Sequence, residues 1–255
     1  MTFSLNLLPE LTFVFLLIFA RLSAIFMALP GFGEQFLSPR MRLGIALSVS
    51  FLMMPLLRTK FGPIPQDIFT LLMLVGHEIV FGLLIGVVIR FIRSSLLTAG
   101  AMIAQQIGVG FVTQVDPTQG GQGIILGNFL AMFGIVLVFA TDLHHLALAA
   151  INDSYTMFPP SGEINFDDMA MSALKSFSSA FVLAIQISAP FLVAGIVFHA
   201  SIGVLARLMP ALPIFFITLP IQILAGFVLF SVLFASIGSW YLAHVDQAFH
   251  MFMVQ

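Results

Sequence analysis

The sequence predicts an all-α membrane protein, and three observations support this fold class. Hydrophobic residues make up 60% of the 255 residues, whereas charged residues make up only 8%. Soluble domains carry roughly 25% charged residues and 45–50% apolar ones, so this chain has too little charge to coat a surface in water. Its apolar stretches also lack the alternation with period two that membrane-barrel strands show. A net charge of −2 argues against a nucleic-acid partner.

Seven apolar segments are predicted to form the helices. They cover residues 11–30, 43–57, 68–89, 94–110, 124–151, 169–206 and 208–245. We interpret the first segment as a retained helix, because the residues before it lack the basic region of a cleaved signal peptide. Asp67 and Asp167 are predicted to cap the helices that follow them or to lie in their first turns, since a carboxylate accepts hydrogen bonds from the free N–H groups there.

The lengths of these segments do not fit a simple bundle of membrane spans. A helix needs about 20 residues to cross a hydrocarbon core of ~30 Å. Segment 43–57 is shorter than this, whereas 169–206 would extend for ~57 Å as one helix. Prolines such as Pro190 and Pro220 can divide the last two segments into half-helices or hairpins. If they do not, the apolar ends project beyond the bilayer and another protein must cover them.

The positions of the basic residues raise the same question. Three successive predicted loops each carry a basic pair, namely Arg40/Arg42, Arg58/Lys60 and Arg90/Arg93. Basic loops prefer the cytoplasmic side, and three successive loops cannot all lie there if every segment crosses the membrane. Either some segments re-enter the membrane, or the chain is held by an assembly of several subunits. We favour the assembly.

Four charged residues fall within or at the edge of apolar segments: Arg21, Glu78, Lys175 and Arg207. Each would cost at least ~2.5–3.5 kcal/mol if it faced lipid at mid-bilayer. One interpretation is an ion or proton pathway. The other is a buried ion pair of Glu78 with Arg21 or Arg207 that fixes the register of the helices. We favour the pair, because one acid is too few for a proton relay.

No catalytic, cofactor or metal site is predicted. The chain has no cysteine, so thiolate chemistry is excluded. His77 and Glu78 form half of a zinc-protease helix motif, but the second histidine of the motif is missing. His144 and His145 are adjacent and are expected to face different directions on a helix, which makes a poor chelate. Asp142 is not expected to supply the missing geometry.

Glycine spacing indicates where helices approach each other closely. Gly82 and Gly86 form one small-xxx-small pair, and Gly123 and Gly127 form another. Such pairs let helix backbones pack in contact.

A stretch that begins near the end of the fourth apolar segment is the most informative part of the sequence. Two polar amides, Gln105 and Gln106, interrupt the apolar pattern there, and Gly108, Gly110 and the isolated Phe111 follow them. Irregular backbone survives in a membrane only where it is buried in protein or lines an aqueous cavity. The stretch is therefore either a gate or constriction loop, or an ordinary exposed loop between helices.

Many short motifs along the chain resemble, in their order and spacing, one known family. They are Arg21, Pro30, Gly33, Pro39, Arg42, Pro55, Glu78, Gly82, Gly86, Gly100-x-x-Ile103-x-x-Gln106-x-Gly108, Asp116-Pro117, His144-His145, Ser154, Pro159, Ala189-Pro190, Arg207-x-x-Pro210, Phe215 and Pro220. The family they resemble is FliR and its injectisome counterparts, the export-gate subunits of bacterial type III secretion. The similarity extends over nearly the whole chain.

The resemblance implies one copy of the chain assembled with FliP and FliQ subunits, with FlhB and FlhA nearby in the inner membrane at the flagellar basal body. It implies that unfolded flagellar proteins pass through a central channel, driven by a separate ATPase and the proton motive force. It also implies that the loop matching residues 106–122 helps to plug the closed channel, and by position this assigns Gln106, Gly108, Gly110 and Phe111 to the plug.

We therefore predict a single non-enzymatic helical subunit over residues 1–255, made of long kinked helices and helical hairpins packed within a hetero-oligomeric export gate. No cofactor is expected. The alternative is a self-sufficient secondary transporter in which Glu78 couples an ion to a solute together with Arg21 or Arg207.

Overall fold

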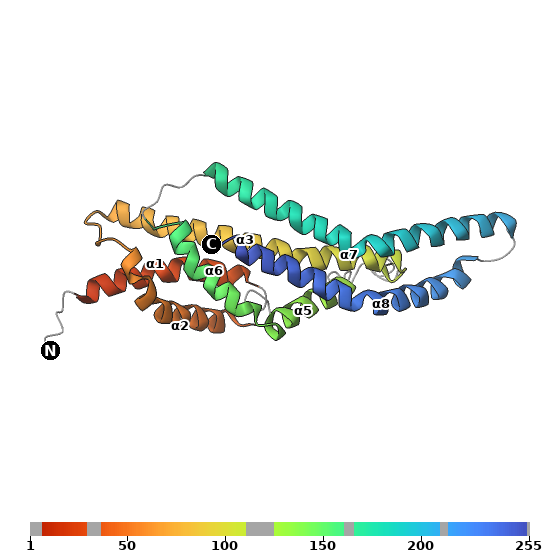
Figure 1. The fold of residues 1–255 in the computed structure, drawn as a ribbon, viewed down its shortest axis with the longest axis horizontal. Coiled ribbons are helices and arrows are strands. Elements are labelled where there is room, and N and C mark those ends of the chain that lie inside the picture. Colours follow the sequence, from red (N-terminus) through yellow and green to blue (C-terminus); the bar gives the residue numbers. More distant parts are fainter. Residues whose placement is uncertain (1–6, 30–36, 111–124, 161–165, 210–213, 254–255) are drawn as a thin grey trace. The chain divides into compact units, whose positions relative to one another are not determined.

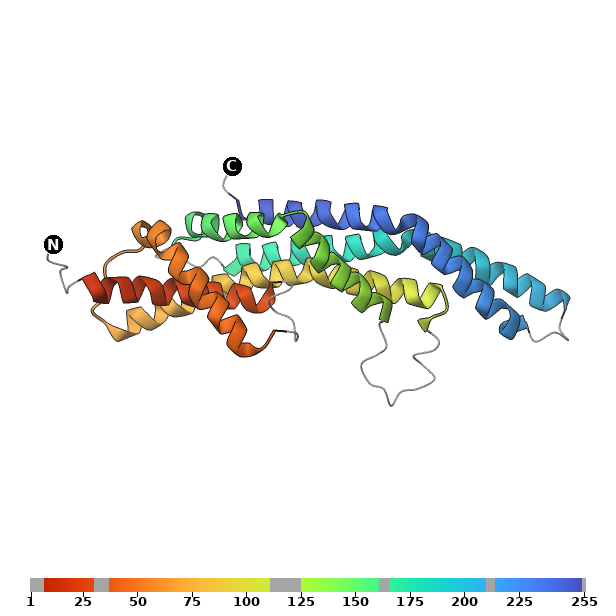
Figure 2. The same ribbon diagram turned by 90° about the horizontal axis from the view of Figure 1, so that it is seen from below.

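The computed structural model describes residues 7–29, 37–110, 125–160, 166–209 and 214–253, and Figures 1 and 2 show it from two directions. Within these ranges the chain forms helices and no strands. The helices are α1 (Leu7–Ala28), α2 (Pro39–Leu57), the short 3₁₀ helix η1 (Arg58–Lys60), α3 (Ile68–Gln106), α5 (Ile125–Ala140), α6 (Leu143–Met157), α7 (Phe166–Leu208) and α8 (Ile214–His250).

Five of these helices are long and apolar enough to cross a membrane, namely α1, α2, α3, α7 and α8. The pair α5 and α6, which a short break separates, makes a sixth if the two count as one broken span. The predicted class, an all-α membrane protein, is confirmed.

Two predicted helices are one helix in the structure. Segments 68–89 and 94–110 merge into α3, which continues through Arg90 and Arg93. Arginine is a good helix former, and no proline or glycine lies in this stretch, so the charges alone do not end the helix. The prediction of a basic loop at this point was wrong. The argument that three successive basic loops cannot all lie on the cytoplasmic side therefore loses one of its three loops.

One predicted helix is divided in two. Segment 124–151 breaks at Thr141 and Asp142 between α5 and α6. Asp142 adopts a left-handed backbone with φ 58°, which is uncommon for residues other than glycine, although Asp tolerates it better than most. No glycine or proline marks the break in the sequence, so the apolar pattern concealed it.

Neither Pro190 nor Pro220 ends a helix. Pro190 lies inside α7, which has 43 residues, and Pro220 lies inside α8, which has 37 residues. At 1.5 Å per residue these helices are about 65 and 56 Å long, well beyond the ~30 Å of a hydrocarbon core. Division into half-helices at Pro190 or Pro220 is therefore wrong, and the last two segments form long apolar helices. That another protein covers their ends stays a prediction.

The predicted helix starts are confirmed. The backbone N–H of Thr70 donates to the Asp67 carboxylate over 3.3 Å at the start of α3, and Asp167 lies in the first turn of α7. At the start of α2, the Met41 N–H donates to the hydroxyl of Ser38 over 3.4 Å. These contacts satisfy N–H groups that no helical carbonyl reaches.

The chain divides into two compact units, and the boundaries fall inside α3, α7 and α8 and at the break between α5 and α6. The first unit comprises residues 1–91, 141–177 and 245–255, and the second comprises 92–140 and 178–244. The prediction of a single subunit over the whole chain stays a prediction.

Glycines bring helices into contact in both units. In the first unit a methyl group on Gly82 would overlap the Arg21 carbonyl oxygen and the Ala24 side chain of α1, as the small-residue spacing predicted. In the second unit Gly100 of α3 lies directly against Gly127 of α5.

Candidate functional site

The first candidate site is a buried ion pair in the first unit. Arg21 of α1 and Glu78 of α3 both have fully buried side chains. The Arg21 Nε donates to Glu78 Oε2 over 2.6 Å, and Nη2 donates to Oε1 over 3.2 Å. A guanidinium that meets a carboxylate through two parallel bonds forms one of the strongest hydrogen-bonded pairs in proteins.

Arg21 also holds the end of α6. Its Nη1 donates to the hydroxyl of Ser154 over 3.3 Å, and its Nη2 donates to the carbonyl of Phe158 over 2.9 Å. The guanidinium carbon lies 3.9 Å from the centre of the Tyr155 ring, a favourable distance for a cation over an aromatic face. Four hydrogen bonds and a ring therefore surround a charge that water does not reach.

His77 extends this contact. It is buried, and its Nδ1 lies 2.9 Å from the carbonyl oxygen of Pro160. A carbonyl only accepts, so Nδ1 carries the proton. Together, Arg21 and His77 bind two carbonyl groups of the segment that follows α6. The cluster joins α1, α3 and α6 and acts as a clamp between them.

Of the two predicted partners of Glu78, Arg21 is the one that contacts it. Arg207 lies exposed in the last turn of α7, in the second unit. Lys175 is also exposed on α7.

The second candidate site is the end of α3, in the second unit, where the predicted plug residues begin. The last hydrogen bonds of the helix are found here. The N–H of Ile107 donates to the carbonyl of Ile103 over 2.9 Å, and the N–H of Gly108 donates to the carbonyl of Gln105 over 3.3 Å. Gly108 has φ +84°. This left-handed conformation after a helix favours glycine, which has no Cβ to clash.

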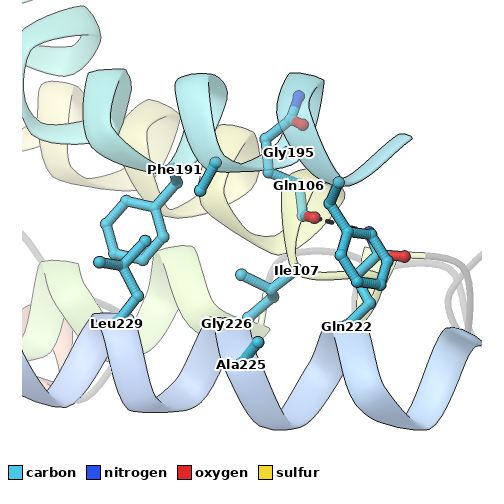
Figure 3. Close-up of a pocket in the computed structure, with 10 residues that line it drawn as sticks. Gln106, Ile107, Phe191, Gly195, Gln222, Ala225, Gly226 and Leu229 are labelled. Carbon is cyan, nitrogen blue, oxygen red and sulfur yellow. Dashed lines mark hydrogen bonds between the residues drawn. The ribbon is translucent and has the colours of Figure 1, made fainter. Parts of the chain in front are cut away.

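Two other helices hold this end of α3. The side-chain amide of Gln222 on α8 donates to the carbonyl of Gln106 over 2.7 Å. Gly195 of α7 faces the Gln106 side chain, and a methyl group there would overlap its amide oxygen. Figure 3 shows Gln106 and Ile107 between the facing sides of α7 and α8.

A pocket of about 80 Å³ lies beside this contact. Its lining is mainly apolar and includes Phe191 and Phe198 of α7 and Leu229 of α8, together with the two glutamines. The site offers no acid, base or nucleophile of the kind that a catalytic pocket needs.

The remaining plug residues stand at the edge of the described structure. Gly110 is buried, and a methyl group on it would approach the Gln105 amide to 2.7 Å. Phe111 lies outside the described residues, so its role stays a prediction.

Comparison with known proteins identifies the family. The family model described as bacterial export proteins, family 1, matches residues 12–248. The chain belongs to this family.

Curated members of the export family are similar along most of their length. The flagellar biosynthetic protein FliR of Caulobacter vibrioides is 39% identical over 214 residues, which cover 84% of this chain and 85% of the relative. FliR of Bacillus subtilis is 29% identical over 232 residues, 88% of this chain and 87% of the relative. The Yop proteins translocation protein T of Yersinia pestis is 29% identical over 220 residues, 84% of this chain and 82% of the relative. The resemblance to the FliR and type III export family is confirmed.

Sequence reasoning about this export-family chain missed three residues that hold the end of α3: Gln222, Gly195 and Gly226. A signal was present, because Gln222 is an uncharged polar residue in an apolar segment, where an amide needs a partner. Gly195 and Gly226 could not be assigned to this contact from the sequence, because the residues of α3 that pack against them are known only from the structure.

The structure also corrects the geometry expected of the adjacent histidines. The rings of His144 and His145 lie with their centres 4.1 Å apart, and one ligand atom from each of Asp142, His144 and His145 lies within 4.8 Å of the others. The side chains of Asp142 and His145 are 77% and 71% exposed. Exposed groups at a helix start do not by themselves define a metal site, and we assign none.

Proposed function

We propose that this chain is a non-enzymatic structural and gating subunit of a flagellar type III protein export channel. It would lie in the bacterial inner membrane at the flagellar basal body and assemble with FliP and FliQ subunits, with FlhB and FlhA nearby. Unfolded flagellar proteins would pass along the axis of the assembly. We propose a flagellar system because FliR of Caulobacter vibrioides is 39% identical, although FliR of Bacillus subtilis and the Yersinia translocation protein are equally similar at 29%.

The observation that carries the proposal is the length of α7 and α8, which exceeds the thickness of a bilayer. Both helices exceed the ~30 Å of a hydrocarbon core by more than tilting can absorb. Large apolar side chains along them are exposed, including Ile196 (68%), Leu208 (73%), Phe216 (77%) and Val232 (72%). Exposed apolar surface of this extent needs lipid or a protein partner to cover it.

The gate in this proposal is the loop that starts at the end of α3. Gln106, Gly108, Gly110 and Phe111 would form its root and its blocking tip. Two features of the described residues support this assignment. Gly108 turns the chain out of the helix, and the carbonyl just before it is held by Gln222, so the loop begins from a fixed position.

The burial of Glu78 argues against the transporter alternative. A coupling carboxylate must exchange an ion with water during each cycle, whereas Glu78 is fully buried and bound through both oxygens to Arg21. A clamp between helices accounts for the same residues.

Native mass measurement after extraction in a mild detergent tests the proposal. The chain should be expressed with the FliP and FliQ subunits of its own organism and purified through a tag on this chain alone. We expect a hetero-oligomer that contains both small subunits in several copies. A monomer or homodimer that moves a solute in liposomes without other subunits would refute the export-gate proposal and support the transporter.

A further inference from the structure

The end of α3 is held inside the second unit by a side chain from another helix, Gln222 of α8. The last carbonyls of a helix lack intrahelical donors, and that of Gln106 accepts a hydrogen bond from the Gln222 side chain over 2.7 Å. This donor comes from a helix more than 100 positions away in sequence. An amide in an apolar helix that reaches a carbonyl of another helix fixes their relative positions.

Two glycines allow this approach. Gly195 on α7 accommodates the Gln106 side chain, and Gly226 on α8 accommodates Ile107, whose Cβ and Cγ2 a methyl group would overlap. Gln222 and Gly226 are four residues apart and therefore share one face of α8. Helix α8 therefore presents both the donor, Gln222, and the small residue Gly226 to the last turn of α3. The second small residue, Gly195, comes from α7 (Figure 3).

Gly108 lies against the same face of α8. A Cβ on it would be 3.1 Å from the Leu219 side chain and 3.5 Å from the Gln222 amide carbon. Its φ of +84° ends the right-handed helical conformation at this residue. The residue at which the backbone leaves the helix is therefore in contact with the residue that holds the helix end.

We propose that Gln222 is a positioning residue for the gate: with Gly195 and Gly226 it anchors the end of α3 and so sets where the loop begins. We call these three residues the α3 anchor. The inference rests on the proposed gate function, because it names what holds that gate at its root. It assigns no contact to the loop itself.

The strength of the anchor suits a movable part. A neutral hydrogen bond shifts an equilibrium by only about 2- to 10-fold, so the bond between Gln222 and Gln106 does not by itself lock the end of α3 in one position. A pocket of about 80 Å³ lies beside this contact and leaves unfilled space next to it, although Ile107 and Gly226 themselves are closely packed.

Hydrogen exchange in the assembled complex tests the anchor directly. Gln222→Leu removes the donor and keeps an apolar helix, and Gly195→Ala displaces the Gln106 side chain. We expect exchange at the amides of Ile107 and Gly108 to become about 2- to 10-fold faster in both variants. The matched controls are Gln186→Leu at an exposed position of α7 and Gly203→Ala, since a methyl group on Gly203 meets nothing within 4 Å.

Ion leakage through the same complexes separates this inference from the gate proposal. Faster exchange together with higher leakage in Gln222→Leu supports the anchor and its role. Unchanged exchange in Gln222→Leu overturns the anchor, even if deletion of residues 108–112 raises leakage and so supports the gate. Faster exchange with unchanged leakage overturns the positioning role of Gln222. If deletion of residues 108–112 also leaves leakage unchanged, the gate proposal fails as well.

Discussion

Arg21 and Glu78 face each other through two hydrogen bonds in the interior of the first unit, and neither side chain is exposed. The pair neutralises two charges that would otherwise be buried alone, and it binds α1 to α3. Because Arg21 also reaches Ser154 and the carbonyl of Phe158, the same charge fixes the end of α6. One salt bridge therefore sets the relative positions of three helices.

Removing one member of this pair is expected to destabilise the chain strongly. Glu78→Leu leaves the Arg21 charge buried and unpaired, which typically costs about 3–5 kcal/mol. The measurement is the free energy or midpoint of unfolding in a mild detergent. Replacing both members, as Arg21→Met with Glu78→Leu, should cost less than Glu78→Leu alone, because no isolated charge remains.

An exposed ion pair of the same unit serves as the control. Arg58 and Glu10 lie 3.6 Å apart, and their side chains are 45% and 54% exposed. Glu10→Gln should change stability by no more than about 1 kcal/mol. If Glu78→Leu costs no more than Glu10→Gln, the clamp between the helices has no energetic importance.

Gly82 and Gly76 should respond oppositely to the same substitution. A methyl group on Gly82 would meet backbone atoms of α1, whereas one on Gly76 meets nothing within 4 Å. We expect Gly82→Ala to destabilise by about 1–3 kcal/mol through overpacking, and Gly76→Ala to stabilise by up to about 1 kcal/mol because alanine favours the helix. Thermal unfolding in detergent measures both. Equal effects at the two positions would contradict the close contact of α1 with α3.

Sequence reasoning succeeded where the signal is local. Composition predicted the fold class, and Asp67 was predicted as a cap because a carboxylate before an apolar run meets free N–H groups. The pairing of Glu78 was expected, because an ion buried alone is too costly. The choice between Arg21 and Arg207 was not available from the sequence, since it depends on which helices pack together.

Three features of the structure were not predicted, and each has its own physical reason. Arg90 and Arg93 were predicted to form a loop because their charges interrupt the apolar pattern, although arginine favours helices. The break at Asp142 has no glycine or proline to reveal it. Gln222 binds a carbonyl of a residue distant in sequence, and no periodic pattern encodes such a contact.

Phe111 is predicted to block the closed channel. Phe111→Ala, or deletion of residues 108–112, should raise ion leakage in cells that contain assembled complexes, because the apolar tip of the gate is removed. Membrane conductance and sensitivity to small toxic solutes measure this leakage. Phe69→Ala is the control, since Phe69 is an exposed phenylalanine at the start of α3. Leakage equal to that of the control, in complexes recovered in normal amount, would remove the gate role.

Val232 tests what covers the apolar surface of α8. Its side chain is 72% exposed, and Val232→Arg would place a charge in that surface at a cost of about 2.5–3.5 kcal/mol if it faces an apolar environment. We expect more than tenfold less complex with the other subunits, measured by co-purification, and little change for Val232→Leu. A photo-crosslinking residue at 232 should capture a protein partner if subunits cover α8. Normal assembly of Val232→Arg, with crosslinks to lipid alone, would mean that α8 faces the bilayer and that the partners bind elsewhere.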